Sequence, residues 1–359
     1  MTVGVVMLNF GEPETPTREE VVPFLERIFL NNAPLERFPN ETARLARCRQ
    51  LAEDRAPGLI ADYERIGGSP LNAQARDEAQ ALQDELTSRG LQAKTRVGMQ
   101  FTDPTIREAV EATRADGADV LVALPMYPIC GFSTNVAAIK SVRDAVSAIG
   151  WDAPVYEVAA WHHDDAYTRY RADNIRSFAH AQGVDLSDDG TLLYFSAHGT
   201  PIKYLDLGSR YDGYVEEHCE RIAHLLGGVR YTLGYQNHSN RGIAWTKPDN
   251  EEHLPTVRAE RVVVEPISFI HEQSETLAEL DLDFRAKVEA LGMAFHRVPT
   301  PNDHARLARV LADLIVPALQ GVPADAGLHP CRCSPGSLCT NGHRTVDCHF
   351  GRRSTATAG

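Results

Sequence analysis

The sequence predicts an α/β protein made of two similar halves, each a parallel sheet flanked by helices, with a cysteine-rich C-terminal extension. Short runs of β-branched and apolar residues alternate with longer amphipathic stretches, a pattern typical of βαβ units. The segment "IGWDAP" supplies glycine and proline between two sets of strands. After residue 320 the chain loses both helical and strand periodicity, which indicates a tail.

Each expected strand is a short apolar run, and each expected helix is a longer stretch with apolar residues three and four positions apart. The strands are residues 3–8, 93–99, 118–124, 154–158, 191–196, 229–235, 261–265 and 294–298. The helices are residues 18–29, 41–66, 73–89, 104–116, 137–149, 165–182, 211–226, 273–291 and 303–319. The order predicts four parts: a Rossmann-like half over residues 1–150, a second over 151–302, a helix over 303–320 that returns to the first half, and a tail over 321–359.

Composition favours a soluble protein of the cytoplasm. No apolar run approaches the ~18 residues that span a bilayer, and "MTVGVVMLNFGEP" lacks the features of a signal peptide. The formal net charge of −13 disfavours binding to nucleic acid. The apolar residues of "FLERIFL" suit either a core or peripheral contact with lipid. We leave open whether the protein is a monomer or a homodimer.

The stretch "FSAHGTP" places His198 where a predicted central strand stops. Gly199 lets the backbone turn, and Pro201 prevents the strand from continuing. Because α/β proteins bind ligands at the carboxyl ends of their parallel strands, we interpret His198 as a site residue. The alternative is a histidine packed at a strand end with both nitrogens satisfied.

A row of carboxylates follows the strand that ends in "VVVEPISF". On a helix, Glu275, Glu279 and Asp283 lie on one side, and Glu272 precedes them on the same side. Like charges at this spacing repel. The row is therefore either a solvated acidic face or a path that passes protons or a divalent cation into a cleft.

Four of the seven cysteines crowd into 18 residues of the tail: Cys331, Cys333, Cys339 and Cys348. Thiolates on a loop rich in glycine and proline are typical ligands of iron–sulfur clusters or zinc. The alternatives are a zinc knuckle that recruits Cys348, His343 or His349, and a reduced tail without fixed structure.

Eight segments together resemble the ferrochelatase family over residues 3 to about 320. They are "VVMLNFGEPET", "PFLERIFLNN", "IGGSPLNAQ", "GMQFTDPTIREAV", "LPMYP", "FSAHGTP", "GYQN" and "PISFIHEQSETLAELD". The resemblance implies a chelatase-type fold and an enzyme of haem biosynthesis, a lyase that inserts ferrous iron, its metal substrate, into a porphyrin.

The resemblance also implies roles for the residues singled out above. His198 would accept a proton or transiently bind the iron, and Glu275 would be its paired glutamate across the cleft. Glu272, Glu279 and Asp283 would continue a path for protons or metal.

Apolar residues that would suit the flat macrocycle are Phe10, Phe29, Leu30, Tyr127 and Ile129, although each would equally suit a core.

Several ferrochelatases carry a [2Fe–2S] cluster held by three C-terminal cysteines and one from the body. The resemblance implies Cys331, Cys333 and Cys339 as the C-terminal ligands. Cys130 would be the fourth ligand, with Cys348 as its competitor. We expect no nucleotide cofactor, because no G-x-G-x-x-G follows the first strand.

The chain departs from the family pattern at three positions. Gln273 stands where a second histidine is common, with His271 two residues earlier. Gln100 stands where arginine is frequent, and Phe10 where relatives often show methionine or tyrosine. The substrate is therefore either protoporphyrin IX or coproporphyrin III. The competing functions are a cobalt or sirohydrochlorin chelatase of the same fold, and a haem or porphyrin carrier.

Overall fold

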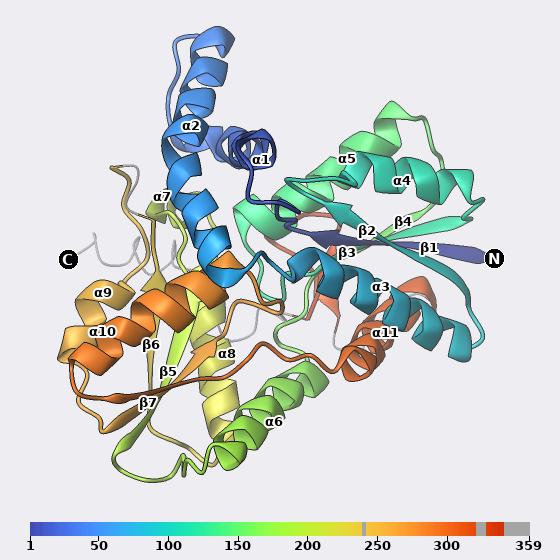
Figure 1. The fold of residues 1–359 in the computed structure, drawn as a ribbon. Helices are drawn as coiled ribbons and strands as arrows, with labels where there is room; N and C mark the ends of the chain where they lie inside the picture. The colour runs from blue at the N-terminus through green and yellow to red at the C-terminus, as the bar shows by residue number, and fades with distance from the viewer. Residues whose placement is uncertain (239–241, 321–327, 341–359) are drawn as a thin grey trace, which may run out of the picture. The chain divides into compact units, whose positions relative to one another are not determined.

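The computed structural model describes residues 1–238, 242–320 and 328–340 (Figure 1). Its contacts group the chain into two compact units. The first unit contains residues 1–126, 133–157 and 271–278. The second unit contains residues 127–132, 158–270 and the chain from residue 279 onward.

The sheet of the first unit is parallel, with the strand order β2 (Gln92–Met99), β1 (Thr2–Asn9), β3 (Val120–Pro125) and β4 (Val155–Ala160). All but the first residue of β1 are buried, as expected of a central parallel strand covered on both faces. Only residues 155–157 of β4 pair with β3, and its last residues belong to the second unit.

Five α-helices accompany this sheet among the described residues: α1 (Arg18–Asn31), α2 (Glu41–Ile66), α3 (Leu71–Ser88), α4 (Ile106–Ala115) and α5 (Ala137–Ala148). A 3₁₀ turn (Ala33–Leu35) follows α1, and a single π turn (Phe132–Val136) precedes α5. The long helix α2 begins where the Asn40 side chain accepts a hydrogen bond from the Ala43 amide, 2.8 Å away. It ends at Gly67, whose φ of 77° is the left-handed conformation that favours glycine.

The sheet of the second unit is also parallel, in the order β6 (Tyr231–Gln236), β5 (Thr191–His198), β7 (Arg261–Pro266) and β8 (Ala294–Arg297). Its described helices are α6 (Asp165–Ala181), α7 (Ile202–Asp206), α8 (Tyr211–Leu225), α9 (Asn250–His253), α10 (Arg285–Ala290) and α11 (His304–Gln320). A 3₁₀ turn (Leu254–Thr256) follows α9, and the π-helix η4 (Glu275–Phe284) runs into α10.

The architecture confirms the predicted fold class, and the predicted strands end within two residues of the observed ones. The division into units, however, follows the chain less simply than the predicted domains do. Residues 271–278 group with the first unit, and α11 groups with the second. The boundaries at residues 150 and 302, and the packing of residues 303–320 on the first half, stay predictions.

Two predicted features are corrected by the structure. The segment 273–291 was expected as one α-helix, but its first part is the π-helix η4. Carboxylates four residues apart lie near one side of either helix type, so a ten-residue pattern does not separate them.

The tail was expected to carry no strands. It forms β9 (His329–Pro330) and β10 (Leu338–Cys339), which pair antiparallel with each other, while β10 also pairs with the end of β4. Strands of two residues are too short to show alternation, so their formation depends on the neighbouring strand.

Candidate active site

His198 is the last residue of β5 and is fixed by its backbone. Its amide donates a hydrogen bond to Ser268 Oγ at 2.7 Å, and its carbonyl accepts one from the Tyr211 hydroxyl at 2.9 Å. A side chain at the next residue would displace Asn237, because a Cβ on Gly199 would lie 1.7 Å from the Asn237 side-chain oxygen. The corner after β5 therefore holds the histidine in one place at the carboxyl edge of the sheet.

Hydrogen bonding decides which nitrogen of His198 carries a proton. Nδ1 lies 2.6 Å from the carbonyl oxygen of Gly199, which can only accept, so Nδ1 is the protonated nitrogen. Burial, the larger effect, lowers the pKa of His198, while the bond to Gly199 acts in the opposite direction. The neutral imidazole therefore presents the lone pair of Nε2.

A second histidine, His238, faces this lone pair. The two Nε2 atoms are 3.2 Å apart, and the ring centroids are separated by 5.2 Å. The Trp245 indole lies beside both rings, 6.4 Å from His198 and 5.8 Å from His238 between centroids. Sequence reasoning missed His238. The available signal was its position two residues after β6, the neighbour of β5, since His198 is in register with Gln236.

The predicted acidic residues lie along η4 and immediately before it. Glu275 accepts a hydrogen bond from the Gln273 amide, and Glu272 accepts one from the Thr276 hydroxyl at 2.7 Å. Glu279, described within the second unit, accepts one from Gln236 Nε2 at 3.0 Å. These three carboxylates are half-buried.

Asp283, four residues beyond Glu279 on η4, is exposed. The row therefore extends along the helix from half-buried to solvent-exposed positions.

Gln273 stands where the resemblance would place a second histidine. Gln273 donates to Glu275, but its amide cannot take up a proton as an imidazole does. His271 is engaged elsewhere, because its Nε2 lies 2.7 Å from a carboxylate oxygen of Glu78, and both side chains are buried.

Glu12 is a further buried acid that sequence reasoning missed. Its carboxylate accepts hydrogen bonds from the Tyr63 hydroxyl at 2.8 Å and the Ser274 hydroxyl at 2.6 Å. Burial raises the pKa of Glu12, and these bonds only partly offset that effect. A carboxyl that holds its proton more readily than usual therefore lies beside the residue preceding Glu275. Nothing in "NFGEPE" predicts this burial.

The apolar residues predicted to contact the macrocycle lie in different environments. Phe29 is 4% exposed and belongs to the core between α1 and α2. Phe10 and Leu30 are partly buried against the same core, and Phe10 meets Phe24 and Phe101 edge-on, with centroids 5.9 and 4.6 Å away.

In the second unit, Ile129 is buried and Tyr127 is half-buried. For all five residues, contact with the macrocycle stays a prediction.

The cysteines expected to share a metal site do lie together. The sulfur atoms of Cys130, Cys331 and Cys333 are within 4.8 Å of one another, and the Cys331 thiol also interacts with Cys339. Contacts with the other thiols raise the pKa of Cys130, with burial adding to the effect. Hydrogen bonds from Cys130 and then Cys333 and Cys339 lower the pKa of Cys331. The remaining alternative ligands, Cys348, His343 and His349, lie outside the described residues.

The loop that carries these cysteines is held by its own backbone and by the second unit. The Cys331 amide donates to the Ser337 carbonyl at 2.8 Å, and the Ser334 amide donates to Cys331 Sγ at 3.4 Å. After Cys339, the Thr340 amide donates to the Ala160 carbonyl at 3.0 Å. Residues 328–340 are thus held by contacts with β4 and by packing of the thiols.

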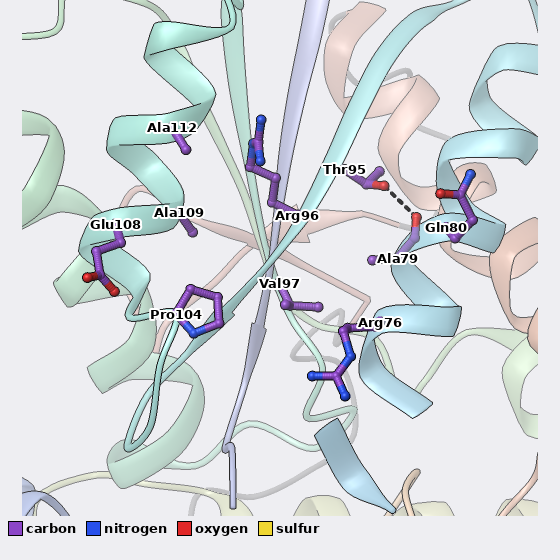
Figure 2. A pocket seen from close by; sticks show the side chains of 10 residues that line it. All are labelled: Arg76, Ala79, Gln80, Thr95, Arg96, Val97, Pro104, Glu108, Ala109 and Ala112. Atoms are coloured by element: carbon purple, nitrogen blue, oxygen red, sulfur yellow. Dashed lines mark hydrogen bonds between the residues drawn. The ribbon is translucent and has the colours of Figure 1, made fainter. Parts of the chain in front are cut away.

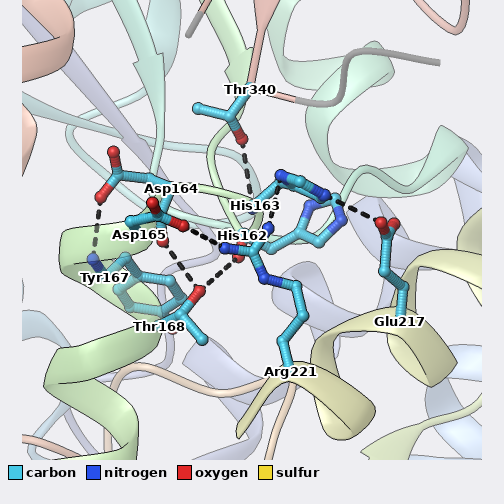
Figure 3. A network of polar contacts seen from close by, with 9 residues as sticks. All are labelled: His162, His163, Asp164, Asp165, Tyr167, Thr168, Glu217, Arg221 and Thr340. Atoms are coloured by element: carbon cyan, nitrogen blue, oxygen red, sulfur yellow. Dashed lines mark hydrogen bonds and ion pairs between the residues drawn. The ribbon is translucent and has the colours of Figure 1, made fainter. Parts of the chain in front are cut away.

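A polar network within the second unit connects Thr340 with His163, Glu217 and Arg221 (Figure 3). The Thr340 hydroxyl accepts the His163 amide at 3.2 Å, and His163 Nε2 lies 2.8 Å from Glu217. Arg221 donates to His163 Nδ1 at 2.5 Å and also pairs with Asp165.

A cavity of about 380 Å³ lies over β2 in the first unit, lined from α3, β2 and the start of α4 (Figure 2). Its polar residues include Arg76, Gln80, Arg96 and Glu108. None of the predicted site residues lines it.

Similarity to known proteins decides the family. The Ferrochelatase family model matches residues 2–319. The chain belongs to the ferrochelatase family.

Individual ferrochelatases match over most of their length. The ferrochelatase of Cyanothece sp. is 32% identical over 334 residues, which covers 89% of this chain and 83% of that protein. The ferrochelatase of Gloeobacter violaceus is 31% identical and covers 88% of this chain and 97% of that protein. Among solved structures, SirB from Bacillus subtilis with Fe3+ is 10% identical with a TM-score of 0.48, covering 89% of this chain and 96% of that one. Across the described residues, no helix has the length and apolarity needed to cross a bilayer.

Proposed function

We propose that this protein inserts ferrous iron into a porphyrin in haem biosynthesis. Its membership of the ferrochelatase family supports this activity. The structural observation that carries the proposal is the imidazole of His198 at the carboxyl edge of a parallel sheet. Its Nδ1 is held by the Gly199 carbonyl, so Nε2 keeps the lone pair that proton transfer or metal binding needs.

Insertion requires two pyrrole N–H protons to leave while iron exchanges water for ring nitrogens. In our proposal His198 Nε2 accepts one proton and becomes an imidazolium. Glu275, whose carboxylate is oriented by Gln273, accepts the other. Glu272, Glu279 and Asp283 then pass protons or metal between the site and solvent.

The substrate in this proposal is a flat tetrapyrrole, protoporphyrin IX or coproporphyrin III. Among the five predicted contact residues, Phe10 and Tyr127 are half-buried aromatic side chains with surface left to contact it. Phe29, Leu30 and Ile129 would add apolar surface in their own units.

The first test compares turnover of His198→Ala with wild type, following zinc or ferrous insertion by porphyrin absorbance. We expect the variant to lose on the order of 10²-fold or more in kcat, because a positioned proton acceptor contributes that much. His224→Ala, on the exposed side of α8, is the matched control. Retained turnover in the His198 variant would reject its role. Binding of porphyrin by wild type without any turnover would favour a carrier instead.

We also propose a [2Fe–2S] cluster ligated by Cys130, Cys331, Cys333 and Cys339. Four thiolates are a common ligand set of such a cluster, and three of the sulfur atoms lie within 4.8 Å of one another. A zinc ion would accept the same donors. When bound, the group would cross-link the tail to residue 130. We assign it no step in catalysis.

The visible spectrum distinguishes an iron–sulfur cluster from a zinc ion at this site. Purified wild-type protein should show sulfur-to-iron charge-transfer bands, and Cys331→Ser should lack them. A colourless protein that contains stoichiometric zinc would overturn the cluster assignment.

For the cellular location we propose the cytoplasm, because thiols kept reduced and metal-bound are typical of a reducing compartment.

A further inference from the structure

The facing histidines of the second unit carry an inference beyond the role of His198 alone. His238 Nε2 lies 3.2 Å from His198 Nε2, and both residues belong to the second unit. Because His198 Nδ1 holds its proton against the Gly199 carbonyl, its Nε2 lone pair points at the other ring. This geometry suits two arrangements, in which the pair shares one proton or receives a cation between the two nitrogens.

The hydrogen-bonding environment of His198 matches that of a metal ligand. A metal-binding histidine almost always donates its other ring N–H to a carbonyl or carboxylate, which fixes the tautomer and orients the ring. His198 does this through Gly199, while Ser268 and Tyr211 hold its backbone. The Nε2 atom is therefore already in the position and protonation state that a ligand needs.

The separation of the two Nε2 atoms also matches that of two imidazole ligands on one metal ion. Divalent metals bind imidazole nitrogen at about 2.0–2.1 Å, so two such ligands in a tetrahedral site are roughly 3.3 Å apart. The observed 3.2 Å is close to this separation. Trp245, beside both imidazoles, restricts the directions in which they can swing.

We propose that His238 and His198 together bind the divalent metal ion before it enters the porphyrin, with Nε2 of each ring as ligand. This inference rests on the proposed function for the identity of the metal as substrate. It assigns to His238, at a different place in the fold, the second imidazole that Gln273 cannot supply. Two neutral nitrogen donors suit ferrous iron, zinc and cobalt alike.

The competing interpretation is a simple hydrogen bond, in which His238 donates its Nε2 proton to His198 and only positions it. The two interpretations differ in the effect on metal affinity. Loss of a positioning residue lowers kcat, whereas loss of a ligand raises the metal concentration needed for half-maximal rate.

The test uses the full-length protein with its cysteine site loaded and titrates Co2+ as the probe, because imidazole-bound cobalt gives d–d bands without sulfur charge transfer. We expect His238→Ala to weaken Co2+ binding roughly 10- to 100-fold, at least as much as loss of an outer-shell partner costs. The KM for zinc or ferrous iron should rise by a similar factor while the KM for porphyrin stays unchanged. His224→Ala should bind Co2+ as wild type does.

Several outcomes would decide the matter. Wild-type Co2+ affinity and metal KM in His238→Ala would overturn the two-histidine site while leaving the proposed function intact. A different result would reject the proposed function and keep the site: the wild-type protein binds cobalt through imidazole, His238→Ala loses that binding, and neither inserts metal into a porphyrin.

If the alanine variant does not fold, His238→Gln serves the same comparison, since it keeps a polar side chain without the imidazole. In the double variant, His198→Ala with His238→Ala, the two losses of Co2+ affinity should be coupled and not simply additive, because both ligands serve one ion.

Discussion

At the scale of single residues, the position of His198 depends on a buried ion pair that holds a neighbouring loop. Arg171 on α6 and Glu265 on β7 are both fully buried and paired with each other. Arg171 also donates to the carbonyls of Phe269 at 2.6 Å and Pro266 at 3.0 Å. These carbonyls flank Ser268, which accepts the amide of His198. One guanidinium therefore holds the loop that positions the histidine.

Replacing this arginine should be costly. We expect Arg171→Met to lower the free energy of unfolding by about 3–5 kcal/mol, because it leaves the Glu265 carboxylate buried and unpaired. The loss of unfolding free energy should be smaller in the double variant Arg171→Met with Glu265→Gln, because the second substitution removes the unpaired buried charge. Urea unfolding measures both.

A matched control for the ion pair is available on the same helix. Arg176 pairs with Asp173 at 2.6 Å with both side chains about half exposed, so Arg176→Met should cost at most about 1 kcal/mol. Equal losses at Arg171 and Arg176 would contradict the role given to burial.

Residues at strand ends could be predicted from the sequence, and residues defined by packing could not. His198 follows a buried strand and precedes glycine, so the amino-acid sequence indicates both the turn and the edge of the sheet. His238 lies beyond a strand whose following loop has no periodic pattern. Glu12 reads as a surface acid, and only the three-dimensional structure shows that Tyr63 and Ser274 enclose it.

At the scale of elements, the two short strands of the tail depend on neighbouring segments for their stability. β9 and β10 have two residues each, too few to be stable alone. β10 is held by pairing with β4, and Cys331 and Cys333 are held by contact with Cys130. If the proposed metal is bound at these thiols, removing it should therefore release residues 328–340.

Limited proteolysis tests this dependence. We expect Cys331→Ser to expose the tail, with early cleavage between residues 328 and 340 and lost hydrogen-exchange protection of the Thr340 amide, which now bonds Ala160. Cys219→Ser, which changes a buried thiol of the same unit outside the cluster, should leave both unchanged. Equal protection in the two variants would show that strand pairing alone orders the tail.

The regular elements were predictable because each is long enough to show its period. The 26 residues of α2 were predicted with both ends correct, since Asn40 and Gly67 mark them. The π-helix η4 was predicted as α, because one side of either helix collects the same carboxylates. Short elements such as α7, α9, β9 and β10 were not predicted, since each of them is too short to show periodicity.

At the scale of the whole molecule, stability should depend on pH through two buried histidines of the second unit. His162 and His218 are both 0% exposed, and no hydrogen-bond partner within the described chain reaches any of their ring nitrogens. Burial lowers the pKa of His162 to about 3 and lowers the pKa of His218 well below its ordinary value. The cationic Arg221 nearby acts in the same direction for both histidines, and Glu217 opposes it for His162.

The direction of the effect follows from proton binding. An unfolded histidine has a pKa of about 6.5. Below that pH the unfolded chain binds protons at both positions, while the folded protein does not. Stability is therefore fully present above about pH 6.5 and falls as the pH drops towards the lowered folded values, by about 1.4 kcal/mol per pH unit for each histidine. Between pH 7 and pH 5 the pair should remove roughly 3–4 kcal/mol.

Urea unfolding of wild type, His162→Gln and His218→Gln at pH 7, 6 and 5 measures this slope. Each variant replaces a titrating ring by an amide that does not titrate, so each should flatten the dependence between pH 6 and pH 5 by about 1.4 kcal/mol per pH unit, whatever its stability at pH 7. His224→Gln on α8 should keep the wild-type slope. If the buried-site variants keep it as well, these imidazoles are protonated equally in both states, and the acid sensitivity must come from other groups.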